Sequence, residues 1–348
     1  MVAISRKRKK AFIIILSLLI LIALIAYGAL HFTFRTPILA QDKNQTIYID
    51  RDDTIDSVYT KLQDALGRDI PKGFTLLSEQ LNYPRKIRPG KYTITTKDTN
   101  QSLVNKLIMG YETPTKLVFN NIRTKEQLAG RMANQLMIDS LEIISILNSE
   151  AYLKEIGYTP ETIVSVFIPN TYEVYWSMTP QQLINRFLSE YSKFWNAERT
   201  AKAETIGFSK LEVSIIASIV EEETNIGDEK PTVAGLYINR LKRGIPLQAD
   251  PTLKFALQDF TIKRILDKDK LVESPYNTYK YAGLPPGPIG LATQQGLESV
   301  LNYQDHNYLY MCAKEDFSGR HNFSTNYAEH IAHSRRYWKA LNQRKIYR

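Results

Sequence analysis

The chain has 348 residues, of which 43% are hydrophobic and 23% are charged, and its formal net charge is +9. This length and composition exclude a disordered or low-complexity chain, and they suffice for two domains besides a membrane segment. The charge is concentrated locally, because removing the five positive charges of residues 6–10 from +9 leaves only +4 for the rest. A net charge this small argues against a nucleic-acid-binding protein, and no nucleic-acid partner is expected.

An uncharged apolar run at the N-terminus has about the length that a helix needs to cross a bilayer. We predict a transmembrane helix at residues 11–31. A cleaved signal peptide is the alternative, but its apolar core is usually only about 7–15 residues long. The basic residues before the span place residues 1–10 in the cytoplasm as a short tail, by the positive-inside rule. We therefore expect a single-pass protein of the bacterial inner (plasma) membrane, with the rest of the chain periplasmic or extracytoplasmic.

The single cysteine, Cys312, permits no intramolecular disulfide. This fits a bacterial envelope protein better than a small secreted domain held by disulfides, and we interpret Cys312 as a packed side chain. His330 and His333 have a spacing that suits a metal, but no acidic or cysteine partner is patterned around them. Neither a phosphate-binding glycine loop nor a Gly-x-Ser-x-Gly elbow occurs. We expect no metal site and no cofactor.

After the span, residues 32–45 are polar and are interpreted as a stalk. An alternating strand pattern begins at residue 46, and a helical pattern follows it with Asp53 or Thr54 as its cap. Further elements are predicted in the order helix, turn, strand and helix, at residues 73–82, at 89–90, at 91–95 and from Asn100 onward. Residues 46–112 are therefore expected to form a small α+β module.

The larger region, residues 113–348, opens with a strand, a turn and a helix that Thr124 would cap, with Gln127 three residues further on. Several amphipathic helices follow, up to about residue 205. From Pro246 onward the sequence is rich in Pro, Gly and Tyr, and such loops on a helical frame are where a binding cleft is expected. The expected fold class is therefore α+β, with an N-terminal transmembrane helix, a small module and a larger, mostly helical domain.

One segment, "SIIASIVEEETN" at residues 214–225, joins an apolar run to three consecutive acids. If residues 211–225 form one helix, a turn of 100° per residue places Glu223 near the centre of the apolar stripe. Glu221 then falls on the opposite face and Glu222 near one edge. A buried carboxyl has a raised pKa and suits a general acid. The alternative is that the helix ends before Glu223 and that all three acids are solvated.

Four segments, "ASIVEEET", "INRLKRGIPLQADPT", "YNTYKYAGLPPGPI" and "HNFSTNYAEH", occur in this order. Together they strongly resemble the YceG-like family of endolytic murein transglycosylases, from about residue 113 to the end. The membrane anchor and a small, LysM-like module agree with the layout of that family. Its pattern is Ser-Ile-hydrophobic-Glu-x-Glu-Thr, and its catalytic acid is the second Glu, which is Glu223 here. Glu221 matches the first Glu and is expected to have a supporting role.

The resemblance implies cleavage of the MurNAc–GlcNAc β-1,4 bond inside nascent peptidoglycan strands without water, which leaves 1,6-anhydro-MurNAc ends and sets strand length. One carboxyl group suffices, because the C6 hydroxyl of the sugar attacks C1 in place of a second carboxylate or water. Glu223 would protonate the leaving oxygen and then accept the hydroxyl proton. Substrate binding is expected from residues of the late loops, for which a turn or packing role is an equal alternative: Gln248, Asp250, Tyr276, Asn277, Tyr279 and Asn326.

The partners implied by the resemblance are peptidoglycan glycan strands, the membrane and penicillin-binding protein synthases. The alternative function is a non-catalytic scaffold that binds peptidoglycan and recruits cell-wall synthases. Two positions depart from the family pattern. Asn170 stands where the family commonly has Asp, and Asp52-Asp53 stand where LysM-like sequences often have glycine.

Overall fold

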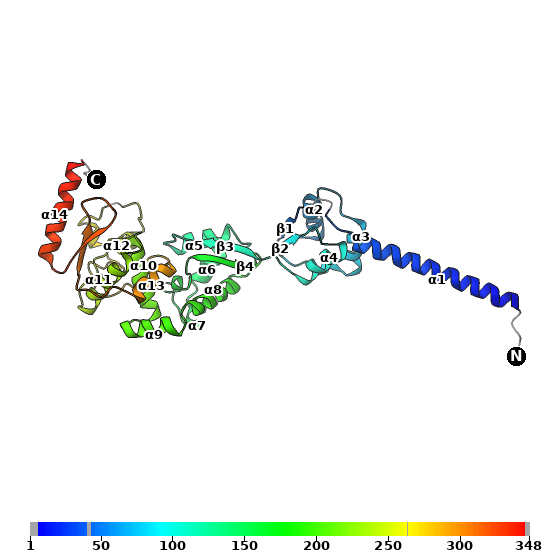
Figure 1. Cartoon of the computed structure of the whole chain (residues 1–348), viewed down its shortest axis with the longest axis horizontal. Helices are drawn as coiled ribbons and strands as arrows, with labels where there is room; N and C mark the ends of the chain where they lie inside the picture. The colour runs from blue at the N-terminus through cyan, green and yellow to red at the C-terminus, as the bar shows by residue number, and fades with distance from the viewer. Residues whose placement is uncertain (1–5, 40–42, 263, 345–348) are drawn as a thin grey trace. The chain divides into compact units, whose positions relative to one another are not determined.

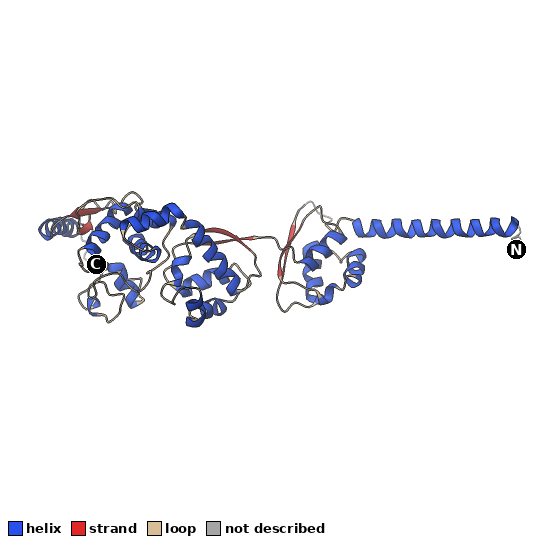
Figure 2. Cartoon of the chain, turned by 90° about the horizontal axis from the view of Figure 1, so that it is seen from below, coloured by secondary structure: helices blue, strands red, loops and turns tan. Residues whose placement is uncertain are grey.

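The computed structural model describes residues 6–39, 43–262 and 264–344. The chain divides into two compact units, and each contains both helices and strands (Figures 1 and 2). The first unit comprises Met1–Lys116 and the short segment Glu173–Ser177, and the second comprises Leu117–Tyr172 and Met178–Arg348. A mixed fold with one N-terminal apolar helix is thus confirmed.

The N-terminal helix α1 spans Arg6–Arg35 and is longer than the predicted 11–31. Its part from Lys9 to Arg35 contains an 18-residue window with a mean hydropathy of 2.9 that the rest of the chain does not bury, so this helix is long and apolar enough to cross a membrane. Its last turn belongs to the small unit, because the Thr33 carbonyl accepts a hydrogen bond from Asn100 Nδ2 at 2.9 Å.

The end of the first described part of the predicted stalk, residues 32–45, packs against the small unit. Ile38 is fully buried in the core of the small unit, and its carbonyl accepts a hydrogen bond from Arg68 at 2.7 Å. Residues 40–42 of the expected stalk lie outside the described residues. The apolar pair Ile38-Leu39 packs because the adjoining module offers it an apolar core.

The remaining elements of the small unit surround one apolar core. They are β1 (Gln45–Ile49), α2 (Ile55–Leu66), α3 (Lys72–Gln80), the 3₁₀ helix η1 (Tyr83–Arg85), β2 (Gly90–Ile94) and α4 (Asn100–Met109). Strands β1 and β2 pair antiparallel, with Gln45 opposite Ile94. Of the two predicted caps of α2, Asp53 and Thr54, it is Thr54 that accepts a hydrogen bond from the Ser57 amide. The likeness of this unit to a LysM module stays a prediction.

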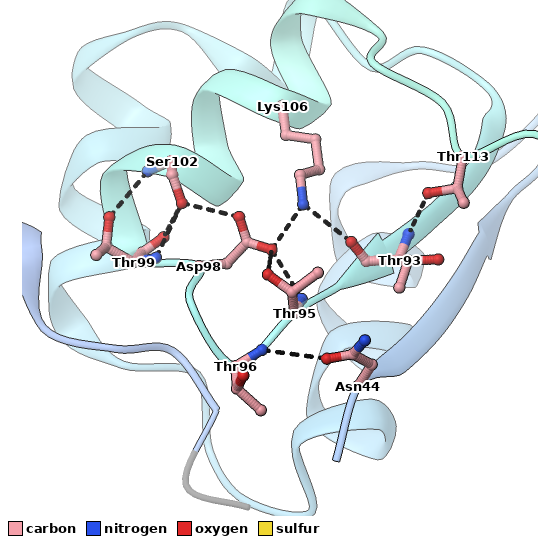
Figure 3. A network of polar contacts seen from close by, with 9 residues as sticks. All are labelled: Asn44, Thr93, Thr95, Thr96, Asp98, Thr99, Ser102, Lys106 and Thr113. Atoms are coloured by element: carbon pink, nitrogen blue, oxygen red, sulfur yellow. Dashed lines mark hydrogen bonds and ion pairs between the residues drawn. The ribbon is translucent and has the colours of Figure 1, made fainter. Parts of the chain in front are cut away.

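The two strand-to-helix connections of this unit repeat one arrangement. After β2, Asp98 Oδ2 accepts hydrogen bonds from the Thr95 amide at 2.7 Å and from Lys106 at 2.6 Å (Figure 3). After β1, Asp53 Oδ2 accepts in the same way from the Asp50 amide at 2.6 Å and from Lys61 at 2.5 Å. In both connections a Thr cap follows the Asp, and the Lys lies eight residues after it. Each network fixes the angle at which a helix leaves its strand.

The second unit is mostly helical. Its first part contains β3 (Thr115–Phe119), whose first residues belong to the small unit, and then α5 (Lys125–Ala133), α6 (Ser140–Leu147), α7 (Glu150–Glu155), η2 (Ile163–Val166), β4 (Asn170–Val174), α8 (Pro180–Phe194) and α9 (Ala197–Ile206). Its second part contains α10 (Lys210–Glu223), α11 (Lys230–Lys242), α12 (Asp250–Leu257), η3 (Asp269–Leu271), α13 (Gln294–Leu301), β5 (Tyr310–Ala313), β6 (His321–Ser324) and α14 (Tyr327–Gln343). Strands β3 and β4 form one two-stranded sheet, and β5 and β6 form another.

Helix α10 is the central element of the second unit. It contacts α9, α11, α12 and α13, and every residue from Val213 to Val220 is buried. Ser209 begins it with a capping box, in which the Ser209 side chain and Glu212 exchange hydrogen bonds with each other's amides. The helix ends at Glu223, because Thr224 has an extended backbone. It therefore does not unwind before Glu223, and the phase of the acids can be judged on a continuous helix.

Candidate active site

A cavity of about 560 Å³ opens in the second unit beside the C-terminal end of α10. Its wall combines residues of α10, α11, α12, β5, β6 and α14 with residues of the loops between them. They are Glu223, Leu236, Tyr237, Arg240, Leu247, Gln248, Asp250, Lys270, Tyr279, Leu309, Tyr310, Met311, Cys312, Ala313, His321, Tyr327 and His330. Three of the predicted substrate-binding residues thus share one cavity with the predicted acid.

Glu223 is the last residue of α10, and its carboxyl is partly buried at the cavity wall. The Tyr237 hydroxyl of α11 donates a hydrogen bond to Glu223 Oε1 at 2.5 Å. Burial raises the pKa of Glu223 to about 7, and the nearby negative charge of Asp250 acts in the same direction. The hydrogen bond from Tyr237 and the charge of Lys254 oppose this rise. The carboxyl can therefore both donate and accept a proton near neutral pH.

Glu221 faces protein and not solvent. Its Oε2 accepts a hydrogen bond from Lys230 Nζ at 2.6 Å, and its Oε1 accepts one from the Thr293 hydroxyl. The side chains of Glu221 and Lys230 are only 16% and 6% exposed, respectively. Gly296 leaves room for the carboxylate, since a Cβ there would lie 2.3 Å from its Oε1. Glu221 thus ties α10 to α11 and α13, a structural role in accord with the predicted supporting one.

Glu222 forms a more exposed ion pair. Arg123 Nε lies 2.9 Å from both carboxylate oxygens, and Nη2 lies 2.8 Å from Oε2. The Glu222 side chain is 25% exposed and the Arg123 side chain is 41% exposed. The three consecutive acids therefore have three environments, namely a buried ion pair, a surface ion pair and the cavity wall.

These environments correct part of the reasoning from helical phase. The position of Glu223 on the helix singled it out as lying on an apolar stripe. However, α10 is buried on all sides, so its apolar residues do not form a single stripe. Glu221 lies on the opposite face, as calculated, and that face packs against α11 and α13. Glu223 reaches a cavity because the helix ends there.

Arg240 shapes the loop that carries two predicted residues. It is 4% exposed and donates to the carbonyls of Pro246 and Leu309, at 2.6–2.9 Å, and to Gln248 Oε1 at 2.7 Å. Gln248 has a positive φ of 52°, a conformation that residues other than Gly and Asn rarely adopt. The buried guanidinium therefore holds Gln248 in a strained turn at the cavity wall.

Asp250 and Tyr279 form a second polar pair in the cavity. The Tyr279 hydroxyl donates to Asp250 Oδ1 at 2.5 Å. Asp250 begins α12, so its carboxylate also lies at the positive end of a helix dipole. Burial and the negative charge of Asp250 raise the pKa of Tyr279, so this phenol stays a donor. The pair places a carboxylate in the cavity that holds Glu223.

The other three predicted substrate-binding residues lie outside this cavity. Tyr276 lines a second pocket of about 260 Å³ with Arg123 and Phe255. Asn277 is fully buried, and its side chain bonds the carbonyls of Lys270 and Val272 and the Tyr279 amide, which fits the packing role given as the alternative to sugar contact. Asn326 caps α14 through the Glu329 amide at 3.0 Å. Sugar contact by Tyr276 and Asn326 stays a prediction, as does contact by Gln248, Asp250 and Tyr279.

Sequence reasoning missed Tyr237 and Arg240, although both lie in or beside a quoted motif. They are three residues apart on α11 and so share a helix face. The chain contains 21 tyrosines, and nothing in the sequence marks which one meets Glu223. It also missed Glu229, a buried carboxylate that binds the Thr224 hydroxyl at 3.0 Å and the His321 amide at 2.8 Å. Glu229 fastens β6, at the rim of the cavity, to the segment that follows Glu223.

The fold and the cavity together define a site for acid–base chemistry on a polar ligand, built around one carboxyl that titrates near neutrality. The sequence model of the YceG-like family matches residues 47–336, and the chain belongs to this family. The resemblance seen in the four motifs is thus confirmed.

Similar proteins carry one name. The endolytic murein transglycosylase of Bacillus subtilis is 29% identical over 238 residues, which cover 63% of this chain and 64% of that protein. The endolytic murein transglycosylase of Streptococcus pneumoniae serotype 2 is 29% identical over 195 residues, which cover 55% of this chain and 33% of that protein. The chain therefore spans less than two thirds of the length of these relatives.

A crystal structure of a putative yceG-like protein from Listeria monocytogenes has the same fold. The two structures match with a TM-score of 0.56 at 24% sequence identity, over 84% of this chain and 99% of the other.

Proposed function

We propose that the chain is a membrane-anchored endolytic lytic transglycosylase. It cleaves the MurNAc–GlcNAc β-1,4 bond of nascent peptidoglycan strands, leaves 1,6-anhydro-MurNAc ends and thereby sets strand length. The names of the relatives support this activity. The observation that carries the proposal is Glu223, a carboxyl with a pKa of about 7 at the wall of a 560 Å³ cavity.

The reaction needs one proton donor that becomes a proton acceptor. Glu223 donates its proton to the glycosidic oxygen as the bond from that oxygen to C1 breaks. The C6 hydroxyl of the same sugar then bonds to C1, and its proton passes to the Glu223 carboxylate. The acid is regenerated and no water is consumed. Intramolecular attack is favoured by high effective molarity when the cavity holds the sugar in the right shape.

The anchor supports a location at the bacterial inner membrane. Helix α1 is long and apolar enough to span a bilayer, and the basic residues at its start support a cytoplasmic N-terminus by the positive-inside rule. The cavity then lies on the periplasmic or extracytoplasmic side. Tethering restricts the enzyme to strands near the membrane, where penicillin-binding protein synthases are the expected partners.

Hydrolysis is a second candidate, and Asp250 is the observation that favours it. Hydrolytic glycosidases use two carboxyl groups, one of which acts as a nucleophile or activates water. Asp250 is a second carboxyl in the cavity. However, its Oδ1 already accepts a hydrogen bond from the Tyr279 hydroxyl at 2.5 Å, so this oxygen is occupied. We therefore assign Asp250 to sugar positioning and Glu223 to proton transfer.

The test is digestion of purified glycan strands by the full chain in detergent micelles, followed by mass spectrometry of the products. We expect shorter strands with anhydro ends. Glu223→Gln should reduce cleavage by at least about 1000-fold, because the amide cannot transfer the proton. Glu222→Gln is the matched control, since it removes the adjacent carboxylate but leaves the cavity intact, and it should cleave like the wild type.

Uncut strands with retained binding would favour the alternative of a peptidoglycan-binding scaffold that recruits synthases. Equal cleavage by Glu223→Gln would exclude Glu223 as the acid.

A further inference from the structure

The two oxygens of the Glu223 carboxyl are not equivalent. Oε1 receives the Tyr237 hydroxyl at 2.5 Å, whereas no donor among the described residues reaches Oε2. Tyr237 is only 2% exposed, so this bond is shielded from water and is stronger than it would be on the surface. Both residues line the cavity, on neighbouring helices that pack together.

We propose that Tyr237 is a positioning residue for Glu223, which holds Oε1 and leaves Oε2 as the oxygen that carries the transferred proton. This proposal rests on the proposed function, because that function makes the glycosidic oxygen the atom that accepts the proton. The phenol donates one hydrogen, and it is directed at Oε1. The proton of the neutral carboxyl then occupies Oε2, the oxygen left for the substrate.

The same bond acts on the second half of the reaction. When Glu223 has given its proton to the glycosidic oxygen, the carboxylate is an anion in a partly buried site. The bond from Tyr237 becomes charge-assisted and stabilises this anion. The sugar hydroxyl later returns a proton to Oε2, and the bond weakens again. Tyr237 thus lowers the pKa of the carboxyl that burial raises.

Other charged and titratable groups also face the carboxyl or line its cavity. The negative charges of Asp250 on α12 and Glu222 on α10 raise the pKa of Glu223, and Lys254 on α12 lowers it. The remaining groups that line the cavity are Arg240, Lys270, Cys312, His321, His330 and the tyrosines 279, 310 and 327. Among the described residues, Tyr237 is the one whose side chain bonds Glu223 directly.

The test is the titration of the Glu223 carboxyl itself, measured on the full chain in detergent micelles. The infrared difference between wild type and Glu223→Gln isolates this carboxyl over a pH series. The same difference is then measured in the Tyr237→Phe background. The midpoint should move up by about one to two pH units, because a hydrogen bond to a charged group contributes about 1.5–3 kcal/mol and one unit corresponds to about 1.4 kcal/mol.

Tyr310→Phe is the matched control, because it removes a hydroxyl from the same cavity that does not bond Glu223. Its midpoint should stay at that of the wild type. An unmoved or lowered midpoint in Tyr237→Phe, or an equal shift in Tyr310→Phe, would overturn the proposal. Site-specific 3-fluorotyrosine at position 237 keeps the ring and serves if Tyr237→Phe fails to fold. Its more acidic phenol should move the midpoint down, and an unchanged or raised midpoint would likewise overturn the proposal.

This titration needs no substrate, so it is independent of the proposed activity. Uncut glycan strands together with a shifted midpoint would reject the activity and keep the role of Tyr237 in holding the carboxyl. Cleavage with an unmoved midpoint would reject the role of Tyr237 and keep the activity. If both hold, the alkaline limb of kcat/KM should move up with the carboxyl midpoint in Tyr237→Phe.

Discussion

At the scale of single residues, three adjacent acids lie in three different environments. Glu221 is neutralised by buried Lys230, Glu222 by the more exposed Arg123, and Glu223 is held by a neutral phenol. Only the last arrangement leaves a carboxyl whose charged form is disfavoured by burial and not restored by an ion pair. This difference supports the proposed role of Glu223 in proton transfer, since the other two carboxylates are each paired with a cation.

The raised pKa of Glu223 predicts the pH dependence of cleavage. The protonated carboxyl is the active form, so activity should be lost as the pH rises through about 7. Above this value the rate of strand cleavage should fall about tenfold per pH unit. The measurement is kcat/KM for glycan strands from pH 5 to pH 9, and a rate that rises between pH 7 and 9 would contradict the assignment.

The same shift predicts an effect on stability. An acid whose pKa is raised on folding binds more protons in the folded state, so the stability contributed by this group decreases between pH 4.5 and about 7. Glu223→Gln removes the cost of the buried charge while the Tyr237 bond can persist. The variant should therefore be more stable than the wild type above pH 7, by about 3 kcal/mol, and equally stable below pH 4. Urea unfolding at several pH values measures the difference, and equal midpoints at pH 8 would refute it.

At the scale of elements, α10 organises the site by packing against four helices and ending at the cavity. Its N-terminal cap, its apolar middle and its final acid all follow from local sequence. The burial of its opposite face does not, because periodicity indicates which positions share a face and not how many faces are covered.

The contrast between Glu221 and Glu222 gives a prediction for the packing of α10. Glu221→Gln leaves the ammonium of Lys230 buried without a counter-charge and should lower the free energy of unfolding by about 3–5 kcal/mol. Glu222→Gln breaks a pair that is largely accessible and should cost at most about 1 kcal/mol. Urea unfolding of the full chain in micelles compares the two variants. Equal losses of unfolding free energy would show that the difference in burial between Glu221 and Glu222 does not affect stability.

Local elements could be predicted from the sequence, but tertiary partners could not. Thr54 and Thr124 cap helices as expected, because a side-chain oxygen three residues before an amide is a local feature. Helical phase and motif both indicated Glu223, and this residue lies at the wall of the cavity. Tyr237 was missed, because its bond to Glu223 depends on how α11 packs on α10. The two alternatives for Asn277 could not be separated, because a polar loop residue that binds a ligand and a buried loop anchor look alike in sequence.

At the scale of the whole molecule, the apolar helix α1 is continuous with the small unit. The Thr33 carbonyl and the buried Ile38 belong to the fold of that unit, so the proposed membrane span is joined to it without a free stalk through Leu39. The segment Glu173–Ser177 returns to the same unit, where Ser177 Oγ donates to Glu112 Oε2 at 2.6 Å and Trp176 packs on Tyr48. The small unit is thus built from three segments of the chain. They are the end of helix α1, the module that follows it and the segment Glu173–Ser177.

This continuity predicts where the chain can be shortened. A chain that begins at residue 32 keeps Thr33 and Ile38, whereas one that begins at residue 43 loses both. The shorter chain should have a small unit destabilised by about 3 kcal/mol, because a fully buried apolar side chain is removed from its core. Hydrogen exchange of β1 and β2 measures this stability in both chains. Equal protection would restore the interpretation of residues 32–39 as a stalk.

The central claim is that Glu223 alone transfers the proton while the sugar supplies the nucleophile, and cleavage in oxygen-18 water tests it most directly. Glycan strands are digested by the full chain in micelles, and the new ends are examined by mass spectrometry. Anhydro ends without oxygen-18, formed by the wild type and by Glu222→Gln but not by Glu223→Gln, are the predicted result. Reducing ends that carry oxygen-18 would show that water is the nucleophile and would contradict the account.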